Sequence, residues 1–339
     1  MAQASTTGVA VGARLAGVEV HLPPRRVPTA ELEAWVGPFR PPPGLLHRLT
    51  GIAARHVMDD DEQASDLAVA AARKVLAATG TSPDEVDLLI FAAASQDLVE
   101  PATAHIVAAK LGVSCPVMDV KNACNSVLNG IETADALIAT GRYRTVLVAC
   151  GESPSRAVRR YVASLREFLR ALPGYTLSDA GAAVLLTACD PPGILASGFA
   201  ADSRHWAAGT LATGGSMHPR DPEHTYFTLD AAALKKAFLS LGTGILDRTL
   251  GEAGLRWDDL AVVGVHQVSL PYLEVFADRA GVPHDKLVVT VAEHGNCAAA
   301  SLPLQLARAR ESGRAGPGDL VGLVGLAGGV SLGLIVVRL

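Results

Sequence analysis

Hydrophobic and polar positions along the chain repeat one arrangement twice. In residues 65–80 apolar side chains recur at helical spacing up to a glycine, and the segment 84–95 follows, which contains a short continuous apolar run. Residues 233–254 repeat the helical pattern, and residues 258–267 repeat the apolar segment. Helical spacing that ends at a glycine predicts a helix, whereas a short apolar run predicts a buried strand.

The elements that follow these two segments also correspond. The first pair is followed by a helix, a short strand, a helix and two closing strands, predicted at 102–111, 116–120, 125–140, 145–152 and 182–189. The second pair is followed by the same series, predicted at 270–281, 286–292, 300–313, 319–329 and 331–339. Because apolar strands alternate with helices, each sheet should be covered on both faces. The chain is therefore predicted to be an internally duplicated α/β protein, with an N-terminal half at 1–190 and a C-terminal half at 191–339.

Three segments interrupt this order. Residues 36–50 are rich in proline, and residues 200–230 are rich in Gly, Pro and His, which predicts a long cap or loop. Residues 156–172 have the pattern of a helix with five arginines. Such arginines usually form a solvated face, but they could also bind a phosphate group or an acidic partner.

Composition excludes several classes of function. The formal charge of −5 over 339 residues leaves no basic stripe, so nucleic acids are poor candidates as partners. No phosphate-binding glycine loop occurs, and the five cysteines lack the spacing of a metal site, so neither a bound cofactor nor a metal is expected. The first 17 residues lack the pattern of a signal peptide, and the longest apolar runs are too short to span a bilayer. We therefore expect a cytoplasmic protein.

Cys124 is the first candidate for chemistry. It lies between a predicted strand and a predicted helix that ends near Gly141. A thiol at a helix N-terminus lies in the positive field of the helix dipole, which favours the thiolate. The alternative is a small buried side chain of no chemical importance, and the residue pattern alone leaves the two about even.

Four further residues lie where strands give way to helices or turns. His266 follows a buried strand, and Asn296 precedes a helix, although a structural histidine and a turn asparagine are common alternatives. Glu100 precedes a proline that could start a helix, where a carboxylate is often only a favourable charge. Gly328 lies in GLAGGVSLG, which fits either a tight hairpin or a backbone N–H donor to an oxyanion.

The order of these motifs resembles the thiolase superfamily and its ketoacyl synthase III branch. The motifs are NAC, VHQ, HGNxxAAS and GLxGG, spread over most of the chain, together with TGIAARH near the start. Several longer fragments are most similar to the enzymes that join two fatty acyl chains head to head in olefin and β-lactone biosynthesis. These fragments are QASDLAVAAARKVL, DLVEPATA, NACNSVLNGI, HQVS and EHGNCAAAS.

The resemblance implies a duplicated thiolase fold with five layers, α/β/α/β/α, pseudo-twofold symmetry and a homodimer. It implies that Cys124 is the nucleophile, with His266 and Asn296 completing the site. Glu100 occupies the position of a glutamate that serves as base in the partner subunit's site. The N–H groups of Cys124 and Gly328 would form the oxyanion hole. The expected reaction is a Claisen condensation between an acyl-cysteine and a second acyl thioester.

Alternatives remain at this stage. The reaction could be a decarboxylative starter condensation, or an acyl transfer to an oxygen or nitrogen acceptor, and the partner could be a paralogue in a heterodimer. The acyl donor could be acyl-CoA or an acyl carrier protein, with Arg48, Arg156 and Arg160 as candidates for contacts to phosphate. The branch often has a tryptophan near TGI that stacks on adenine, and no tryptophan occurs in GLLHRLTGI. This difference makes a carrier protein more credible.

Overall fold

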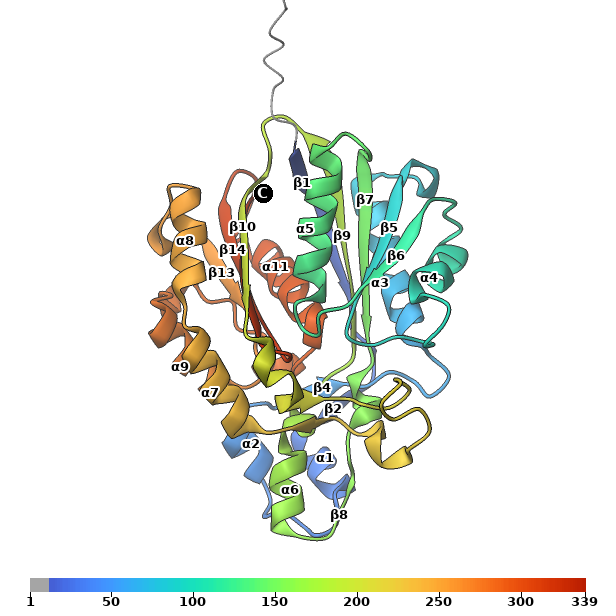
Figure 1. Cartoon of the computed structure of the whole chain (residues 1–339), viewed down its shortest axis with the longest axis vertical. Helices are drawn as coiled ribbons and strands as arrows, with labels where there is room; N and C mark the ends of the chain where they lie inside the picture. Colours follow the sequence, from blue (N-terminus) through green and yellow to red (C-terminus); the bar gives the residue numbers. More distant parts are fainter. Residues whose placement is uncertain (1–11) are drawn as a thin grey trace, which may run out of the picture.

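The structure, a computed structural model, describes residues 12–339, so most of the segment that we judged not to be a signal peptide lies outside the described residues. Two sheets form its centre (Figure 1). The first has the order β1 (Gly12–His21), β9 (Ala180–Cys189), β7 (Thr145–Glu152), β5 (Leu88–Ala92) and β6 (Val117–Val120). The second has the order β10 (Ile194–Ala201), β15 (Ser331–Arg338), β14 (Leu320–Ala327) and β13 (Val262–Val265).

The two sheets repeat one pattern of strand pairing. In the first, β9 is antiparallel to both β1 and β7, and β7, β5 and β6 are parallel. In the second, β15 is antiparallel to both β10 and β14, and β14 is parallel to β13. The predicted strand at 286–292 is wrong. This segment occupies the position that corresponds to β6 of the first sheet, but it forms only one bridge, between Leu287 and Val263. Two of its N–H groups bond instead to the Gln267 side chain.

Helices cover both faces of each sheet. The helices α5 (Ser126–Ala139) and α11 (Ser301–Glu311) lie between the sheets (Figure 1). The helices α3 (Ala64–Thr79) and α4 (Thr103–Leu111) cover the outer face of the first sheet, and α8 (Gly244–Glu252) and α9 (Leu270–Ala280) cover that of the second. The five-layer α/β/α/β/α arrangement predicted from the sequence is therefore confirmed.

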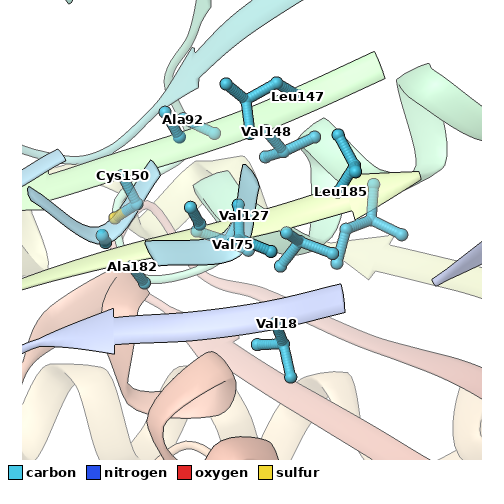
Figure 2. Close-up of a cluster of buried hydrophobic side chains, with 14 of the residues drawn as sticks. Val18, Val75, Ala92, Val127, Leu147, Val148, Cys150, Ala182 and Leu185 are labelled. Atoms are coloured by element: carbon cyan, nitrogen blue, oxygen red, sulfur yellow. The ribbon is translucent and has the colours of Figure 1, made fainter. Parts of the chain in front are cut away.

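Small aliphatic side chains fill the space between the first sheet and its helices. Figure 2 shows Val75 of α3 and Val127 of α5 with Val148, Ala182 and Leu185 of the sheet. A glycine permits the closest approach, because a Cβ at residue 151 of β7 would lie only 1.8 Å from the carbonyl oxygen of Ala64. Close packing of this kind explains why so few aromatic residues are needed.

The structure corrects the predicted boundaries in two places. The helix expected at 233–254 is divided into α7 (Ala231–Leu241) and α8, because Gly242 has a φ of 71° and ends the first helix. The strands β1 and β10 were not predicted from the sequence. Both are rich in Ala and Gly, residues that favour strands weakly, and their burial does not alternate regularly.

The proline-rich and arginine-rich segments pack together in the lower part of Figure 1. This part contains β2 (Arg26–Pro28), α1 (Thr29–Trp35), β3 (Gly37–Pro38), α2 (Leu45–Thr50), β4 (Ala54–His56), β8 (Tyr161–Val162) and α6 (Leu165–Ala171). Phe168 and Tyr175 are fully buried in its separate core. The single helix predicted at 156–172 is wrong, because β8 pairs with β3 and Ser164 caps a new helix by accepting the N–H of Glu167.

The cap at residues 200–230 is mostly irregular, as predicted. Its regular parts are the short strands β11 (Gly209–Thr210) and β12 (Thr228–Leu229) and two 3-10 turns, at Ser203–Ala208 and Pro222–Thr225. None of the helices in the described part of the chain combines the length and the apolar character needed to cross a bilayer.

Candidate active site

The candidate residues follow strands that end at one edge of each sheet. Because β5, β6 and β7 are parallel, their carboxyl ends meet at the same edge. Cys124 follows β6, Glu152 is the last residue of β7, and the segment that carries Glu100 follows β5. In the second sheet, His266 directly follows β13. This edge is where ligands of open α/β sheets bind.

Cys124 lies in a tight turn, residues 122–126, which we call the Cys124 turn. Ala123 has a φ of 46°, a left-handed conformation that costs free energy for a residue with a Cβ. The Ser126 side chain accepts the N–H of Asn122 at 2.8 Å and donates to the Ala123 carbonyl at 2.7 Å. These bonds hold the thiol at the start of α5.

The Cys124 turn is tied to the hairpin between β14 and β15. The Asn125 side chain donates to the Ser331 hydroxyl at 2.9 Å, and that of Asn122 reaches the same hydroxyl at 3.5 Å. A Cβ at Gly325 would lie 2.1 Å from Asn125 Oδ1, so only glycine permits this approach. Gly328 lies in the turn of this hairpin, and the tie places its segment next to that of Cys124.

His266 is buried and neutral. Its backbone N–H donates to the Val324 carbonyl at 2.8 Å, which holds His266 beside β14. Its exposed fraction is 2%, and burial lowers the pKa of the imidazole to about 4. Nδ1 is a buried atom without a hydrogen-bond partner among the described residues. A neutral imidazole has one donor and one acceptor nitrogen.

Gln267, the next residue, fixes the segment that leads to Asn296. Its Oε1 accepts the N–H groups of Thr290 and Val291 at 2.9 and 3.0 Å, and its Nε2 donates to the Val288 carbonyl at 2.6 Å. The short helix α10 (Val291–His294) begins there. The Gln267 side chain therefore supplies the hydrogen bonds that a neighbouring strand would make with residues 286–292, the segment predicted as a strand.

Asn296 is held from both sides. Its N–H donates to the Thr176 carbonyl at 2.8 Å, and its own carbonyl accepts the N–H of Ser178 at 2.9 Å. Its Oδ1 accepts the N–H of Ala298 at 3.0 Å, so its Nδ2 is the group left to donate. Like Ala123, Ala298 is left-handed, with a φ of 47°.

Glu152 joins the two halves beneath the site. Its buried carboxylate accepts the N–H groups of Ala94 and Ser95, the Ser95 hydroxyl and the N–H of Ala299, at 2.8 to 3.3 Å. Burial raises the pKa of Glu152 despite these bonds. Burial, together with the Glu152 charge, also raises the pKa of Cys124 to about 12. This opposes the preference for thiolate expected from the helix N-terminus, so Cys124 needs a base or a substrate to ionise.

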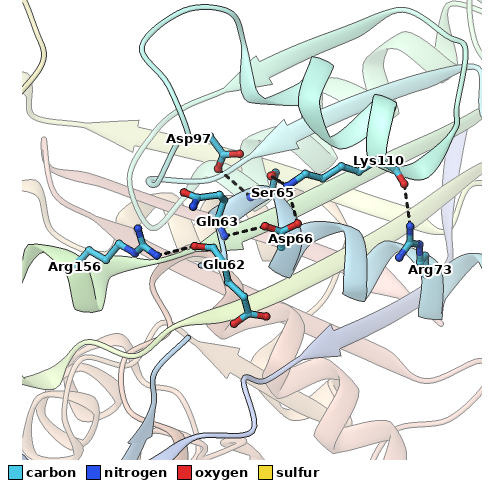
Figure 3. A network of polar contacts seen from close by, with 8 residues as sticks. All are labelled: Glu62, Gln63, Ser65, Asp66, Arg73, Asp97, Lys110 and Arg156. Atoms are coloured by element: carbon cyan, nitrogen blue, oxygen red, sulfur yellow. Dashed lines mark hydrogen bonds and ion pairs between the residues drawn. The ribbon is translucent and has the colours of Figure 1, made fainter. Parts of the chain in front are cut away.

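Glu100 lies at the exposed tip of a firmly anchored loop. The start of the loop is bound by Glu152, which accepts the N–H of Ala94. Asp97 accepts the N–H of Ser65 at 3.0 Å (Figure 3), and its own N–H donates to the Thr103 hydroxyl. Between these anchors, Leu98 is 52% and Val99 68% exposed, and Glu100 is exposed as well. The loop thus presents an acidic group and two apolar side chains outward.

The three arginines proposed for phosphate contacts have different local partners. Arg48 donates to the Pro43 carbonyl at 3.1 Å, and the guanidinium of Arg160 lies 4.7 Å from the centre of the Trp35 ring. Arg156 donates to the Glu62 carbonyl at 2.7 Å, as Figure 3 shows. All three are exposed. Their role in binding stays a prediction.

The roles of Glu152, Gln267 and the pair Asn125–Ser331 in the structure were not predicted from the sequence. Signals for two of them exist in the sequence. Glu152 is a charged residue at the end of an otherwise apolar strand, and Gln267 is a polar residue directly after His266. Buried polar groups at strand ends usually bond to backbone N–H groups nearby, as both do here. The Asn125–Ser331 contact joins positions too distant in sequence to be predicted.

The sequence matches a known family over more than half of its length. Residues 118–203 match 3-oxoacyl-[acyl-carrier-protein] synthase III, and residues 250–339 match the C-terminal region of the same family. The first match contains Cys124, and the second contains His266, Asn296 and Gly328. Glu100 lies outside both.

The chain belongs to the 3-oxoacyl-[acyl-carrier-protein] synthase III family. It is therefore an acyltransferase of the condensing type that acts on acyl thioesters. Its fold is the α/β thiolase fold of this family. The resemblance found in the sequence motifs is confirmed.

Solved structures agree with this assignment. A variant of OleA from Xanthomonas campestris in which a cysteine is replaced by alanine is 26% identical, with a TM-score of 0.87 over 97% of each chain. OleA from the same organism with bound lauric acid and lauroyl-CoA has 26% identity and a TM-score of 0.86, over 97% of this chain and 99% of that chain. The 3-oxoacyl-[acyl-carrier-protein] synthase III of Aquifex aeolicus has 25% identity and a TM-score of 0.83, over 97% and 100%.

Proposed function

We propose that this synthase III family member joins two fatty acyl thioesters head to head, by a Claisen condensation that needs no decarboxylation. The observation that carries the proposal is the placement of Glu100, a carboxylate presented outward by a loop anchored at both ends. A condensation without loss of carbon dioxide requires a base to remove an α-proton. A carboxylate at this position can supply it.

Similarity to OleA supports the same assignment. One solved OleA structure holds lauric acid and lauroyl-CoA, and others carry replacements of a cysteine, a histidine or a glutamate. The replaced cysteine and histidine are separated by the same number of positions as Cys124 and His266. The replaced glutamate precedes its cysteine by nearly the same interval as Glu100 precedes Cys124.

In the first half of the proposed reaction, Cys124 attacks an acyl thioester. The backbone N–H groups of Cys124 and Gly328 hydrogen-bond the tetrahedral oxyanion, and the departing thiol leaves the acyl group on sulfur. Because the pKa of Cys124 is raised to about 12, the thiol must give up its proton as it attacks. The neutral imidazole of His266 accepts that proton during the attack and passes it to the departing thiolate, because burial disfavours a lasting imidazolium.

In the second half, Glu100 removes the α-proton of a second acyl thioester. His266 and Asn296 hydrogen-bond the enolate oxygen that forms, through the imidazole and the Asn296 Nδ2 amide. The α-carbon then attacks the acyl carbon on Cys124, the C–S bond breaks, and a β-ketoacyl thioester leaves. The released Cys124 thiolate takes up a proton equivalent to the one that Glu100 removed, so that Glu100 is again a carboxylate and Cys124 again a thiol. The atoms balance without an external oxidant, reductant or metal.

We propose that Glu100 acts in the site of the partner subunit of a homodimer. The two apolar side chains next to it, Leu98 and Val99, are exposed in the single chain and would be covered by a second copy. The loop is anchored through Asp97 and Ser95, so it can project its tip without losing its shape.

Product analysis by mass spectrometry tests the reaction. Purified enzyme is given saturated acyl-CoAs of several lengths, lauroyl-CoA included, with and without malonyl-CoA. We expect a β-keto acid, or the ketone formed by its decarboxylation, that contains two intact acyl chains and requires no malonate. A product formed only with malonyl-CoA would favour decarboxylative condensation. A mass gain on Cys124 without any condensed product would favour acyl transfer or a heterodimer.

Mixing two inactive variants tests the position of Glu100. Cys124→Ala and Glu100→Gln chains are unfolded and refolded together, and activity is compared with that of each variant alone. If Glu100 acts across the interface, activity recovers to roughly a quarter of wild type, because half of the dimers are hybrids with one complete site. If it acts within its own chain, no hybrid site is complete and no activity returns. Glu252→Gln, on the exposed face of α8, is the matched control and should keep full activity.

A further inference from the structure

The cap contains a group of three potential metal ligands that the condensation does not use. His218, Asp221 and His224 follow one another at intervals of three residues. One ligand atom of each lies within 4.8 Å of the others, and His224 Nε2 lies 3.5 Å from Asp221 Oδ2. The two imidazole rings stack with centroids 3.5 Å apart. Both histidines are half-buried and Asp221 is exposed.

The local backbone holds the three residues in one compact unit. The N–H of His218 donates to the Gly215 carbonyl, and the His218 carbonyl accepts the N–H of Gly214, both at 3.2 Å. The His224 carbonyl accepts the N–H of Thr213 at 3.1 Å. Asp221 uses Oδ1 to accept the N–H of Glu223 at 3.0 Å, which caps the 3-10 turn at Pro222–Thr225. Its other oxygen, Oδ2, is therefore the one that faces His224.

Two imidazoles and one carboxylate form a donor set that suits Zn²⁺ and similar divalent transition ions. Bonds of about 2.0–2.2 Å in a tetrahedral site place neighbouring donor atoms about 3.3–3.6 Å apart. The separation of His224 Nε2 and Asp221 Oδ2 already has this value. The third donor lies within 4.8 Å, and the His218 ring must turn out of the stack for its lone pair to point at the same ion. The exposed side leaves room for water as a fourth ligand.

We propose that His218, Asp221 and His224 form a binding site for a divalent transition ion of the zinc class within the cap. The proposal does not depend on which condensation the enzyme performs.

The position of the site indicates what a bound ion would do. The cap is fastened to the arginine-rich segment by an ion pair between Arg159 and Glu223 at 3.0 Å, and Phe227 donates its N–H to the Ala157 carbonyl at 2.9 Å. On its other side, a Cβ at Gly214 would lie 3.3 Å from Val99, the neighbour of Glu100. An ion that fixes residues 218–224 thus stiffens the segment beside the Glu100 loop.

Metal titration tests the proposal directly. Protein without a histidine tag is freed of metal with EDTA, dialysed and titrated with ZnCl₂ by calorimetry and with CoCl₂ by visible absorption. We expect one ion per chain and a cobalt spectrum without thiolate charge-transfer bands. His218→Ala, His224→Ala and Asp221→Asn should each weaken binding at least about tenfold, because each removes one of three protein ligands. Asn at 221 retains the cap of the 3-10 turn, so this variant removes the charged ligand and keeps the fold.

Two controls keep the result interpretable. His284→Ala removes a surface histidine that pairs with Asp278 at 2.8 Å, and it should leave zinc binding unchanged. Zinc should also raise the thermal midpoint, and slow proteolysis in residues 200–230, of wild type and of His284→Ala but not of the three ligand variants. Absence of zinc uptake, uptake that is equal in all variants, or cobalt spectra with thiolate bands would each overturn the proposal. The stacked histidines would then be only a contact within the loop.

Discussion

In each half of the molecule, a turn with a left-handed alanine precedes the central helix, and we call this turn a corner. The two corners differ in the residue that follows the alanine. Ala123 and Ala298 have φ values of 46° and 47°, and each lies three residues before the first residue of its helix, Ser126 of α5 or Ser301 of α11. The residue after the left-handed alanine is Cys124 in the first half and Ala299 in the second.

The difference lies in what occupies the position after the alanine. In the C-terminal corner, the N–H of Ala299 donates to Glu152, so that the backbone helps to hold a buried carboxylate. In the N-terminal corner the same position carries the Cys124 thiol. The two halves thus contain the same backbone turn. In the C-terminal half the turn binds Glu152, whereas in the N-terminal half it carries the Cys124 thiol. Both corners retain a costly backbone conformation, which indicates that the surrounding contacts determine it.

The largest expected effect comes from removing the side chain that distinguishes the corners. Cys124→Ala should lower condensation at least about 10³-fold, because no nucleophile remains to hold the acyl group. Cys297→Ala, in the C-terminal corner, should stay within a fewfold of wild type, although Cys297 is fully buried. Steady-state product formation from acyl-CoA measures both. A Cys297 variant as inactive as the Cys124 variant would contradict the division of roles.

The next largest effect is a loss of stability when the left-handed alanines are replaced by a larger residue. Ala123→Val and Ala298→Val should each lower the free energy of unfolding by about 1–3 kcal/mol, because a β-branched residue tolerates a positive φ poorly. Ala123→Gly and Ala298→Gly are the matched controls and should be neutral or slightly stabilising. Urea denaturation followed by circular dichroism gives the four values. If valine were accepted at one corner only, the two corners would not be equivalent.

A smaller effect depends on pH and on the C-terminal half. The folded pKa of His266 is about 4, below its ordinary value of 6.5. Stability from this residue is therefore complete above pH 6.5 and is lost as pH falls toward 4, because the unfolded chain takes up a proton that the folded chain refuses. At pH 5 the loss should be about 2 kcal/mol. His266→Asn should remove that part of the pH dependence in urea denaturation, whereas His284→Asn, on the surface, should not.

The smallest expected effect is on the pKa of Cys124, through Glu152, which accepts the N–H of Ala299 and whose charge raises that pKa. Glu152→Gln removes a negative charge that raises the pKa of Cys124, so the thiolate fraction at pH 8 should rise about three- to tenfold. The rate of iodoacetamide labelling of the Cys124 peptide, followed by mass spectrometry, measures this. Asp179→Asn is the control, because Asp179 is an equally buried carboxylate that binds Met58 and Ser155 instead. Slower labelling of the Glu152 variant would contradict the electrostatic explanation.

Most of the framework could be predicted from the sequence, because helices such as α3 and α5 show an apolar stripe that ends near a glycine. Segments whose partners are side chains could not. Residues 286–292 are apolar enough for a strand, but Gln267 takes two of their N–H groups. The arginine-rich segment has helical periodicity, but its pairing with β3 divides it.

The candidate residues Cys124, His266 and Asn296 could be found because each lies directly after or before a predicted element. How the segments that carry them are joined could not be predicted from spacing, since contacts between the halves such as Asn125–Ser331 and Ala299–Glu152 connect residues far apart in sequence. The same holds for the raised pKa of Cys124. It follows from burial and from Glu152, neither of which has a signal near the cysteine.

The bond between Asn125 and Ser331 also has a consequence for the chain during its synthesis. The two residues are 206 positions apart, so the ribosome exposes the Cys124 segment long before Ser331 has been made. Until then, the turn lacks the contact that joins it to the hairpin of Gly328. Domains fold during synthesis as their residues emerge. A nascent chain therefore carries Cys124 before the hairpin of Gly328 exists, and the oxyanion hole that we propose can form only once β15 has been added.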